Sequence, residues 1–183
     1  MFYRPTDLKR EPPIFNGVEA CWMVAKPAME RARGTPVFQD PSVVAAFCHT
    51  IVEDSYMDPR DLLPDFQAYC KRVCSEGCVE ELSIPGSVHD SGNSDRYAGS
   101  MVNVGKKFFA LNNGFIGLGP GLLAEGDFCC VLFGSNVPFV VRPTAEPNGQ
   151  KLLGPCYVHG AMFGEAIQAW KQGSLQPCPI IFV

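Results

Sequence analysis

The chain has 183 residues, of which 46% are hydrophobic, 11% aromatic and 19% charged, and its formal net charge is -4. This composition is typical of one globular domain and argues against a disordered chain. Because the net charge is negative and the basic residues form no cluster longer than a pair, we expect neither nucleic acid nor a membrane as a partner.

The start of the chain and its cysteines indicate the compartment. Residues 1–10 contain no apolar core of a signal peptide, and the longest apolar run, residues 128–133, is far too short to span a bilayer. The nine cysteines are an odd number, which is typical of free thiols that pack as small hydrophobic side chains in a reducing compartment. We therefore expect a cytoplasmic protein.

The N-terminal part of the chain predicts an arm followed by helices. Residues 1–40 are rich in proline and charge, and we interpret them as an extended arm with a short helix near residues 18–23. A helical part, residues 41–80, begins at Asp40-Pro41, an N-cap acceptor followed by proline. The apolar residues between positions 43 and 52 fall on one face of this helix.

A second helix and a loop follow. Asp58-Pro59 repeats the helix-start signal, and the apolar periodicity then continues to about Cys74. Residues 83–100 are rich in glycine, serine and aspartate and predict a loop. His89-Asp90 in this loop is either part of a lid over a pocket or solvated surface.

From residue 101 the apolar period changes to two, which is typical of strands. The predicted strands are residues 107–111, 115–118, 128–133, 137–142 and 151–159, and residues 165–171 predict a short closing helix. Asn112-Asn113-Gly114 tolerates the positive φ of a hairpin turn, and Pro138 places its strand at an edge or a bulge. We therefore predict a single α+β domain spanning residues 1–183, in which residues 101–170 form a small antiparallel β-barrel of about five to six strands beside the N-terminal helices.

Five motifs between residues 105 and 166 occur in an order that resembles a known family. They are Gly105–Phe109, Gly114–Pro120, Gly126-Asp127, Val137–Arg142, and Cys156–Met162 with Gly164–Ala166. This stretch resembles the C-terminal region of fungal heterokaryon-incompatibility (HET) domain proteins. Residues 47–54 resemble a helix of the same family that contains Arg-Thr-Leu, with His49 where arginine is usual, so that the similarity covers roughly residues 43–170.

The sequence departs from this family in two respects. The family's N-terminal signalling domain, which has a Toll-receptor-like fold and a Ser-x-x-Trp-Gly stretch, has no counterpart here, so we do not expect the activities tied to it. Leu111, Phe115 and Phe163 replace a threonine, a tyrosine and a polar residue of the family pattern. These changes make one region more apolar, as a pocket for an apolar ligand requires, or they are substitutions within the core.

Polar residues near the predicted strand ends are candidates for catalysis. His159 and Glu165 could act as general acid or base, Tyr157 as a proton donor, and Arg142 as the partner of an oxyanion or enolate. Asp127 at the start of the central strand completes this catalytic set. Each residue also has a structural interpretation, as the cap of a turn or helix or as the partner of a backbone carbonyl.

Neither a metal site nor a cofactor is expected from the sequence. Cys70, Cys74 and Cys78 recur at every fourth residue, but zinc usually has four ligands, and only His49 or His89 could complete the set. We interpret these cysteines as a buried stripe of thiols. In Gly117–Gly121 the third glycine of a dinucleotide-binding fingerprint is missing, and Pro120 removes an N–H donor.

Two functions of different classes remain open. The first is a small stand-alone enzyme of fungal secondary metabolism that catalyses a cofactor-independent cyclisation or isomerisation of an apolar small-molecule substrate. Its substrate would contact five residues, Phe109, Leu111, Phe115, Phe163 and His49. The second is a non-catalytic protein-interaction or regulatory module, and the strand edges leave room for a homodimer. An enzyme requires an apolar cavity lined by the polar set, whereas an interaction module requires a filled barrel and an exposed apolar patch.

Overall fold

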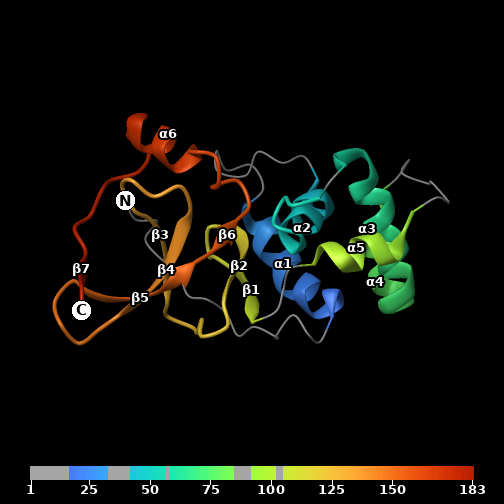
Figure 1. The fold of residues 1–183 in the computed structure, drawn as a ribbon, viewed down its shortest axis with the longest axis horizontal. Helices are drawn as coiled ribbons and strands as arrows, with labels where there is room; N and C mark the ends of the chain where they lie inside the picture. Colours follow the sequence, from blue (N-terminus) through green and yellow to red (C-terminus); the bar gives the residue numbers. More distant parts are fainter. Residues whose placement is uncertain (1–16, 33–41, 57, 85–91, 102–104) are drawn as a thin grey trace.

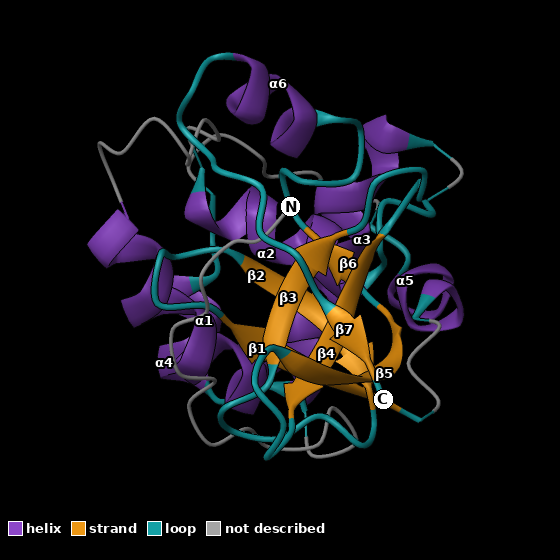
Figure 2. Ribbon diagram, turned by 90° about the vertical axis from the view of Figure 1, so that its left-hand side faces the viewer, coloured by secondary structure: helices purple, strands orange, loops and turns teal. Residues whose placement is uncertain are grey.

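The computed structural model describes residues 17–32, 42–56, 58–84, 92–101 and 105–183, with helices α1–α5 at one end and the strands at the other (Figure 1). The helices are α1 (Val18–Ala32), α2 (Val43–Ile51), α3 (Pro59–Val73), α4 (Glu76–Glu81), α5 (Ser94–Ser100) and α6 (Glu165–Lys171). The strands are β1 (Lys106–Ala110), β2 (Ile116–Pro120), β3 (Phe128–Val131), β4 (Pro138–Pro143), β5 (Gly149–Pro155), β6 (Tyr157–Val158) and β7 (Ile181–Phe182). The α+β class is therefore confirmed. Seen from the strand end, α6 lies apart from the other helices (Figure 2).

The described strands form two sheets, and the predicted single closed barrel is not observed. One sheet has the order β1-β2-β6 and the other β3-β4-β5-β7, in which β5 and β7 are parallel and the remaining pairs antiparallel. The stretch predicted as one strand, residues 151–159, divides at Cys156 because β5 pairs with β4 whereas β6 pairs with β2. A bulge between Val140 and Val141 and a positive φ at Gly154 redirect the chain at this corner.

The β1-β2-β6 sheet is the middle layer of the molecule and has a hydrophobic core on each face. Side chains that alternate along its strands pack on the helices, with α1 against β1 and α2 against β2. The members of the sheet on this face are Phe108, Ala110, Ile116, Leu118 and Tyr157. The opposite face carries Phe109 and Val158, which pack on Leu123, Cys129 and Val140 between the two sheets.

Two glycines of β2 make room for an aromatic ring. A Cβ added at Gly117 would lie 2.6 Å from Cζ of Phe109 and 2.2 Å from the carbonyl oxygen of Tyr157. A Cβ at Gly119 would lie 2.8 Å from Cδ1 of Leu123. The glycines of the Gly117–Gly121 stretch therefore permit close packing between the sheets.

The helices differ from the sequence prediction in three places. The short helix expected at residues 18–23 extends to Ala32 because its buried residues keep a helical spacing past Pro27. Two short helices, α4 and α5, were not predicted, since their residues have little apolar periodicity. The prediction of a loop over residues 83–100 is therefore wrong for its last seven residues, which form α5 (Ser94–Ser100). An N-cap still marks α5, where the side chain of Asn93 accepts hydrogen bonds from the N–H groups of Asp95 and Arg96. His89-Asp90, Asp40-Pro41 and the first 16 residues of the predicted arm lie outside the described residues.

The first four strands and the closing helix lie where they were predicted, and Pro138 was expected to place its strand at an edge or a bulge. Strand β4 lies inside its sheet, between β3 and β5, and not at an edge, but it does contain the bulge between Val140 and Val141. Pro138 is tolerated there because it is the first residue of the strand, where its missing N–H costs no ladder hydrogen bond. The closing helix spans Glu165–Lys171 as predicted, and β7 was not predicted.

Two findings bear on the predicted compartment. All nine cysteines are free thiols, as expected, and seven of them are buried. Within the described parts of the chain, the helices are all too short or too polar to cross a membrane.

Candidate functional site

Four polar side chains meet where the end of α2 approaches β6, and we call them the polar cluster: His49, Asp54, Tyr157 and His159. Nδ1 of His49 lies 2.7 Å from Oδ1 of Asp54, and the Tyr157 hydroxyl donates a hydrogen bond of 2.6 Å to Oδ2 of Asp54. The same hydroxyl lies 3.2 Å from Nδ1 of His159. The two imidazole rings are 6.1 Å apart. The cluster therefore joins two residues of the catalytic set to one of the predicted substrate-contacting residues.

The turn after α2 places Asp54 in the polar cluster. Glu53 and Asp54 both adopt left-handed backbone conformations, with φ of 52° and 55°, which are uncommon outside glycine. The Asp54 N–H donates to the carbonyl oxygen of His49 at 3.1 Å, and the turn thereby folds back on the helix end. Lys106 of β1 forms an ion pair with Glu53, which ties the turn to the middle sheet.

The two central groups of the polar cluster, the Asp54 carboxyl and the Tyr157 hydroxyl, have pKa values that are shifted in opposite directions. Burial would raise the pKa of Asp54, but hydrogen bonds with His49 and Tyr157 outweigh it, and the pKa lies below its ordinary value. Burial and the hydrogen bond to Asp54 raise the pKa of Tyr157 well above its usual range. A carboxylate thus faces a protonated phenol and two imidazoles, which is a chemically competent arrangement for moving a proton.

Solvent reaches the cluster from the side of His49 and Asp54. Their side chains are 34% and 29% exposed, whereas Tyr157 is buried beneath them. Asp54, the central acceptor, was not among the predicted site residues. The only signal for it in the sequence is its position within the stretch of residues 47–54 that resembles the HET family.

Asp127 and Arg142 form a separate ion pair and do not join the polar cluster. Nε and Nη2 of Arg142 donate to the two carboxylate oxygens of Asp127 at 2.6 and 2.8 Å, and Nη2 also donates to the Leu122 carbonyl. The Asp127 carboxylate accepts a further hydrogen bond from the N–H of Ala124. This pair closes the loop between β2 and β3.

The remaining predicted site residues are distributed over different parts of the fold. Glu165 accepts a hydrogen bond of 2.7 Å from the N–H of Phe163 at the start of α6, and the Phe163 side chain is exposed. Phe109, Leu111 and Phe115 are buried in the core between the sheets. The apolar residues predicted to bind a substrate therefore do not line one surface, because the packing of the middle sheet directs three of them inward.

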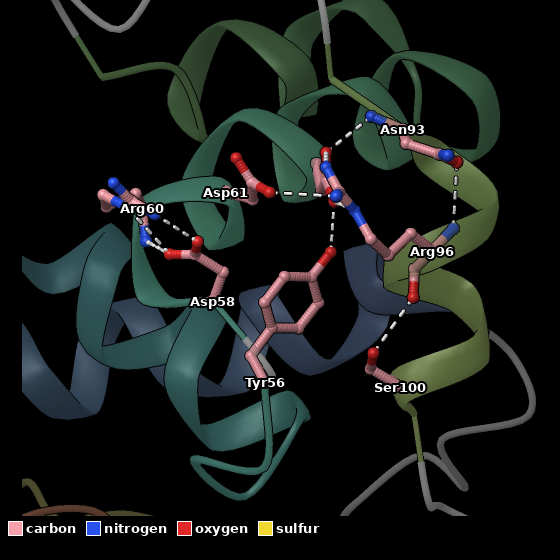
Figure 3. Close-up of polar contacts among 8 residues, drawn as sticks. Tyr56, Asp58, Arg60, Asp61, Asn93, Arg96 and Ser100 are labelled. Carbon is pink, nitrogen blue, oxygen red and sulfur yellow. Dashed lines mark hydrogen bonds and ion pairs between the residues drawn. The ribbon is translucent and has the colours of Figure 1, made fainter.

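A second polar network supports the turn that carries Asp54. The buried carboxylate of Asp65 on α3 accepts hydrogen bonds from Tyr56, from Arg96 and from the N–H of Asn93 (Figure 3). Tyr56 lies two residues after Asp54, so this network holds the end of the turn against α3 and α5. Asp65 was not recognised in the sequence, because the residues that bind it are distant along the chain.

One group of three side chains in the described residues has the geometry to hold a metal ion. The ligand atoms of Glu19, Cys74 and Cys78 lie within 4.8 Å of one another. They belong to α1, the end of α3 and α4, on the helical side of the molecule.

Comparisons with known proteins agree with the motifs in the sequence. The Het-6 beta-barrel domain family matches residues 42–173. Heterokaryon incompatibility protein 6, OR allele, of Neurospora crassa is 41% identical over 71 residues, which are 38% of this chain. The chain covers only 10% of that relative's length. No solved structure matches the chain.

Proposed function

The chain belongs to the Het-6 beta-barrel domain family, and from this premise we propose that it is a non-catalytic protein-recognition module of the heterokaryon-incompatibility type. The name of the Neurospora relative supports this class of function. We also propose that the two sheets, joined at Cys156, correspond to the two halves of the family's barrel.

A filled interior beside an exposed aromatic pair is the observation that carries the proposal. The space between the sheets is occupied by eight buried side chains, among them Phe109 and Phe115. At the end of the strand half, the rings of Phe133 and Trp170 pack edge to face with centroids 5.1 Å apart, while 57% and 37% of these residues remain exposed. Large aromatic residues that stay accessible are typical anchors of protein interfaces.

A third exposed aromatic residue lies near the start of α6, the helix that carries Trp170. Phe163, two residues before α6, is 79% exposed, and α6 lies at the same end of the molecule as the turn between β3 and β4 (Figure 1). We call Phe133 and Trp170, whose rings are in contact, the aromatic patch. Because the side chains between the sheets are buried in contact with one another, we propose that the aromatic patch is the surface of the strand half that contacts another protein.

The proposal is tested by expressing the tagged chain in hyphae of Neurospora crassa. Neighbouring proteins are identified by proximity labelling, and heterokaryon growth is scored in parallel. A variant carrying Phe133→Ser and Trp170→Ser should lose both the labelled partner and any effect on growth. Met23→Ser, which changes an exposed apolar residue of α1, is the matched control and should retain both. Identical labelling and growth for the double variant and the wild type, with equal thermal stability, would exclude the aromatic patch as the surface that binds the partner.

The polar cluster favours a second candidate function, acid–base catalysis. His159 would accept or return a proton, Tyr157 would donate one, and Asp54 would orient both Tyr157 and His49. The reaction would be the cofactor-independent cyclisation or isomerisation of an apolar metabolite. Asp127, Arg142 and Glu165 would then have structural roles.

Ligand retention and turnover test this second candidate. The purified chain is incubated with polyketide or terpenoid extracts, and retained compounds and products are identified by mass spectrometry. Tyr157→Phe and His159→Ala should abolish turnover without preventing folding. If no compound is retained and both variants change only stability, the enzyme hypothesis is excluded.

A further inference from the structure

Glu19, Cys74 and Cys78 form a compact group at the junction of three helices, which we call the thiol–carboxylate site. Glu19 lies in the first turn of α1, Cys74 follows the last residue of α3, and Cys78 lies in α4. One ligand atom of each residue lies within 4.8 Å of the ligand atoms of the other two. The site is distant along the chain from the polar cluster residues of β6 and does not contribute to the proposed function.

The backbone between α3 and α4 builds this group. Cys74 ends α3 in an extended conformation, with φ of −102° and ψ of 159°, so the chain turns before α4 begins. The Glu19 carboxylate accepts hydrogen bonds from the N–H of Ser75 at 3.1 Å and from its hydroxyl at 2.7 Å. These two contacts span 56 residues of sequence and fix the carboxylate beside the two thiols.

We propose that Glu19, Cys74 and Cys78 bind a zinc ion. Zn²⁺ takes thiolate sulfur at about 2.3 Å and carboxylate oxygen at about 2.0–2.2 Å, so tetrahedral ligands are separated by roughly 3.5–4 Å. The observed separations therefore need only a small contraction of side chains. Three protein ligands leave the fourth position to water, because Cys74 and Glu19 are only partly buried.

The surroundings of Cys74 and the position of Glu19 distinguish this site from a simple stripe of buried thiols. Cys70 is fully buried in the apolar core, as the sequence analysis expected for all three cysteines. Cys74, in contrast, is packed against a carboxylate, which an apolar role does not require. The third ligand comes from α1 and not from His49, which pairs with Asp54, and sequence spacing offers no signal for a residue so distant.

Cobalt titration of the full chain in a non-thiol reductant tests the proposal. Co²⁺ substitutes for zinc and should give thiolate-to-cobalt charge-transfer and tetrahedral ligand-field bands that saturate at one equivalent and disappear on adding Zn²⁺. Cys74→Ser and Cys78→Ser should each weaken binding at least about tenfold. Cys178→Ser, which changes an exposed free thiol, is the matched control and should bind as the wild type does.

A second measurement on the unmodified chain guards against variants that fail to fold. Zn²⁺ should protect Cys74 and Cys78 from alkylation by iodoacetamide, read by peptide mass spectrometry, while Cys178 reacts equally with and without metal. Saturating Zn²⁺ should also raise the melting temperature. Absence of the cobalt bands, equal alkylation with and without Zn²⁺, or unchanged cobalt affinity in folded Cys74→Ser would each overturn the proposal.

Discussion

The carboxylates of Asp54 and Asp127 both lie next to strand termini, yet their partners differ in kind. Asp127 is 1% exposed and is held by the permanently charged guanidinium of Arg142 and by a backbone N–H. The side chain of Asp54 is 29% exposed, and its partners are a phenol and an imidazole. Fixed donors hold a charge in place, whereas titratable donors can also give up a proton. The first arrangement is suited to structure and the second to chemistry or switching.

The partners of the two carboxylates, Arg142 on β4 and Tyr157 on β6, lie on different sheets, which explains why the carboxylates do not form one site. Arg142 pairs with Lys151 near the start of β5, and Tyr157 lies six residues further along, or roughly 20 Å of extended chain. Because the chain passes from one sheet to the other at Cys156, β4 and β6 belong to different sheets, and the side chains at their ends do not form one site.

The largest effect expected from this comparison follows Arg142→Ala. The substitution leaves the buried Asp127 without its counter-charge, which should cost about 2–4 kcal/mol of the free energy of unfolding, somewhat less than in a fully buried pair because Arg142 is 40% exposed. Urea denaturation measures the loss. The NMR signals of His49 and His159 should stay unchanged, and their movement would show that the two sites are coupled. Arg60→Ala, which removes the exposed pair with Asp58, is the control and should leave the urea midpoint unchanged.

Gly117→Ala tests the sheet that separates the two regions. The added methyl group would meet the Tyr157 carbonyl and the Phe109 ring, and such overpacking typically costs about 1–3 kcal/mol. Because Tyr157 must shift, the His159 signals should move as well. Gly99→Ala, at a helical position with nothing within 4 Å of the new Cβ, is the matched control. Equal stability of the two variants would contradict the close packing of β2 on β1 and β6.

The sequence was most informative where local patterns determine structure. The strands of residues 106–143 and the helix Glu165–Lys171 follow from apolar periodicity and turn residues, and the family follows from ordered motifs. Tyr157 and His159 were both predicted to belong to the catalytic set, and the structure brings them together at the hydroxyl of Tyr157.

Long-range features could not be predicted from the same patterns. The turn that places Asp54 contains two residues with left-handed backbone conformations, and neither is a glycine that would have marked the turn in the sequence. The residues that bind Asp65 lie 9 to 31 positions away from it along the chain. The change of sheet at Cys156 depends on a bulge in a neighbouring strand, which alternation does not reveal. In the sequence, the apolar residues at 111 and 115 were open to two interpretations, a pocket or the core, and packing between the two sheets makes them core.

Tyr157→Phe should lower the free energy of unfolding less than Arg142→Ala or Gly117→Ala does. It removes one hydrogen bond to a charged acceptor and should cost about 1–2 kcal/mol. Because that hydrogen bond helps to lower the pKa of Asp54, the carboxyl pKa should rise in the variant, as measured by ¹³C NMR titration. An unchanged Asp54 titration would show that His49 alone sets the charge state of the cluster.

The smallest expected effect is the pH dependence of the difference in unfolding free energy between wild type and Tyr157→Phe. It tests most directly whether Asp54, unlike Asp127, has partners whose hydrogen bonds depend on its charge. The pKa of Asp54 is lower in the folded protein than in the unfolded chain, so its contribution to stability is complete above about pH 4 and is lost as the pH falls through the folded value. A protonated carboxyl still accepts the Tyr157 hydroxyl, but a hydrogen bond to a neutral group is roughly half as strong. The difference in unfolding free energy between wild type and Tyr157→Phe should therefore narrow by about half as the pH falls from 6 through the titration of Asp54 in the folded protein, as measured by urea midpoints. A gap that stays constant while the ¹³C signal of Asp54 reports its protonation would mean that the Tyr157 hydrogen bond does not depend on the charge of Asp54, and the polar cluster would then be a passive hydrogen-bond network.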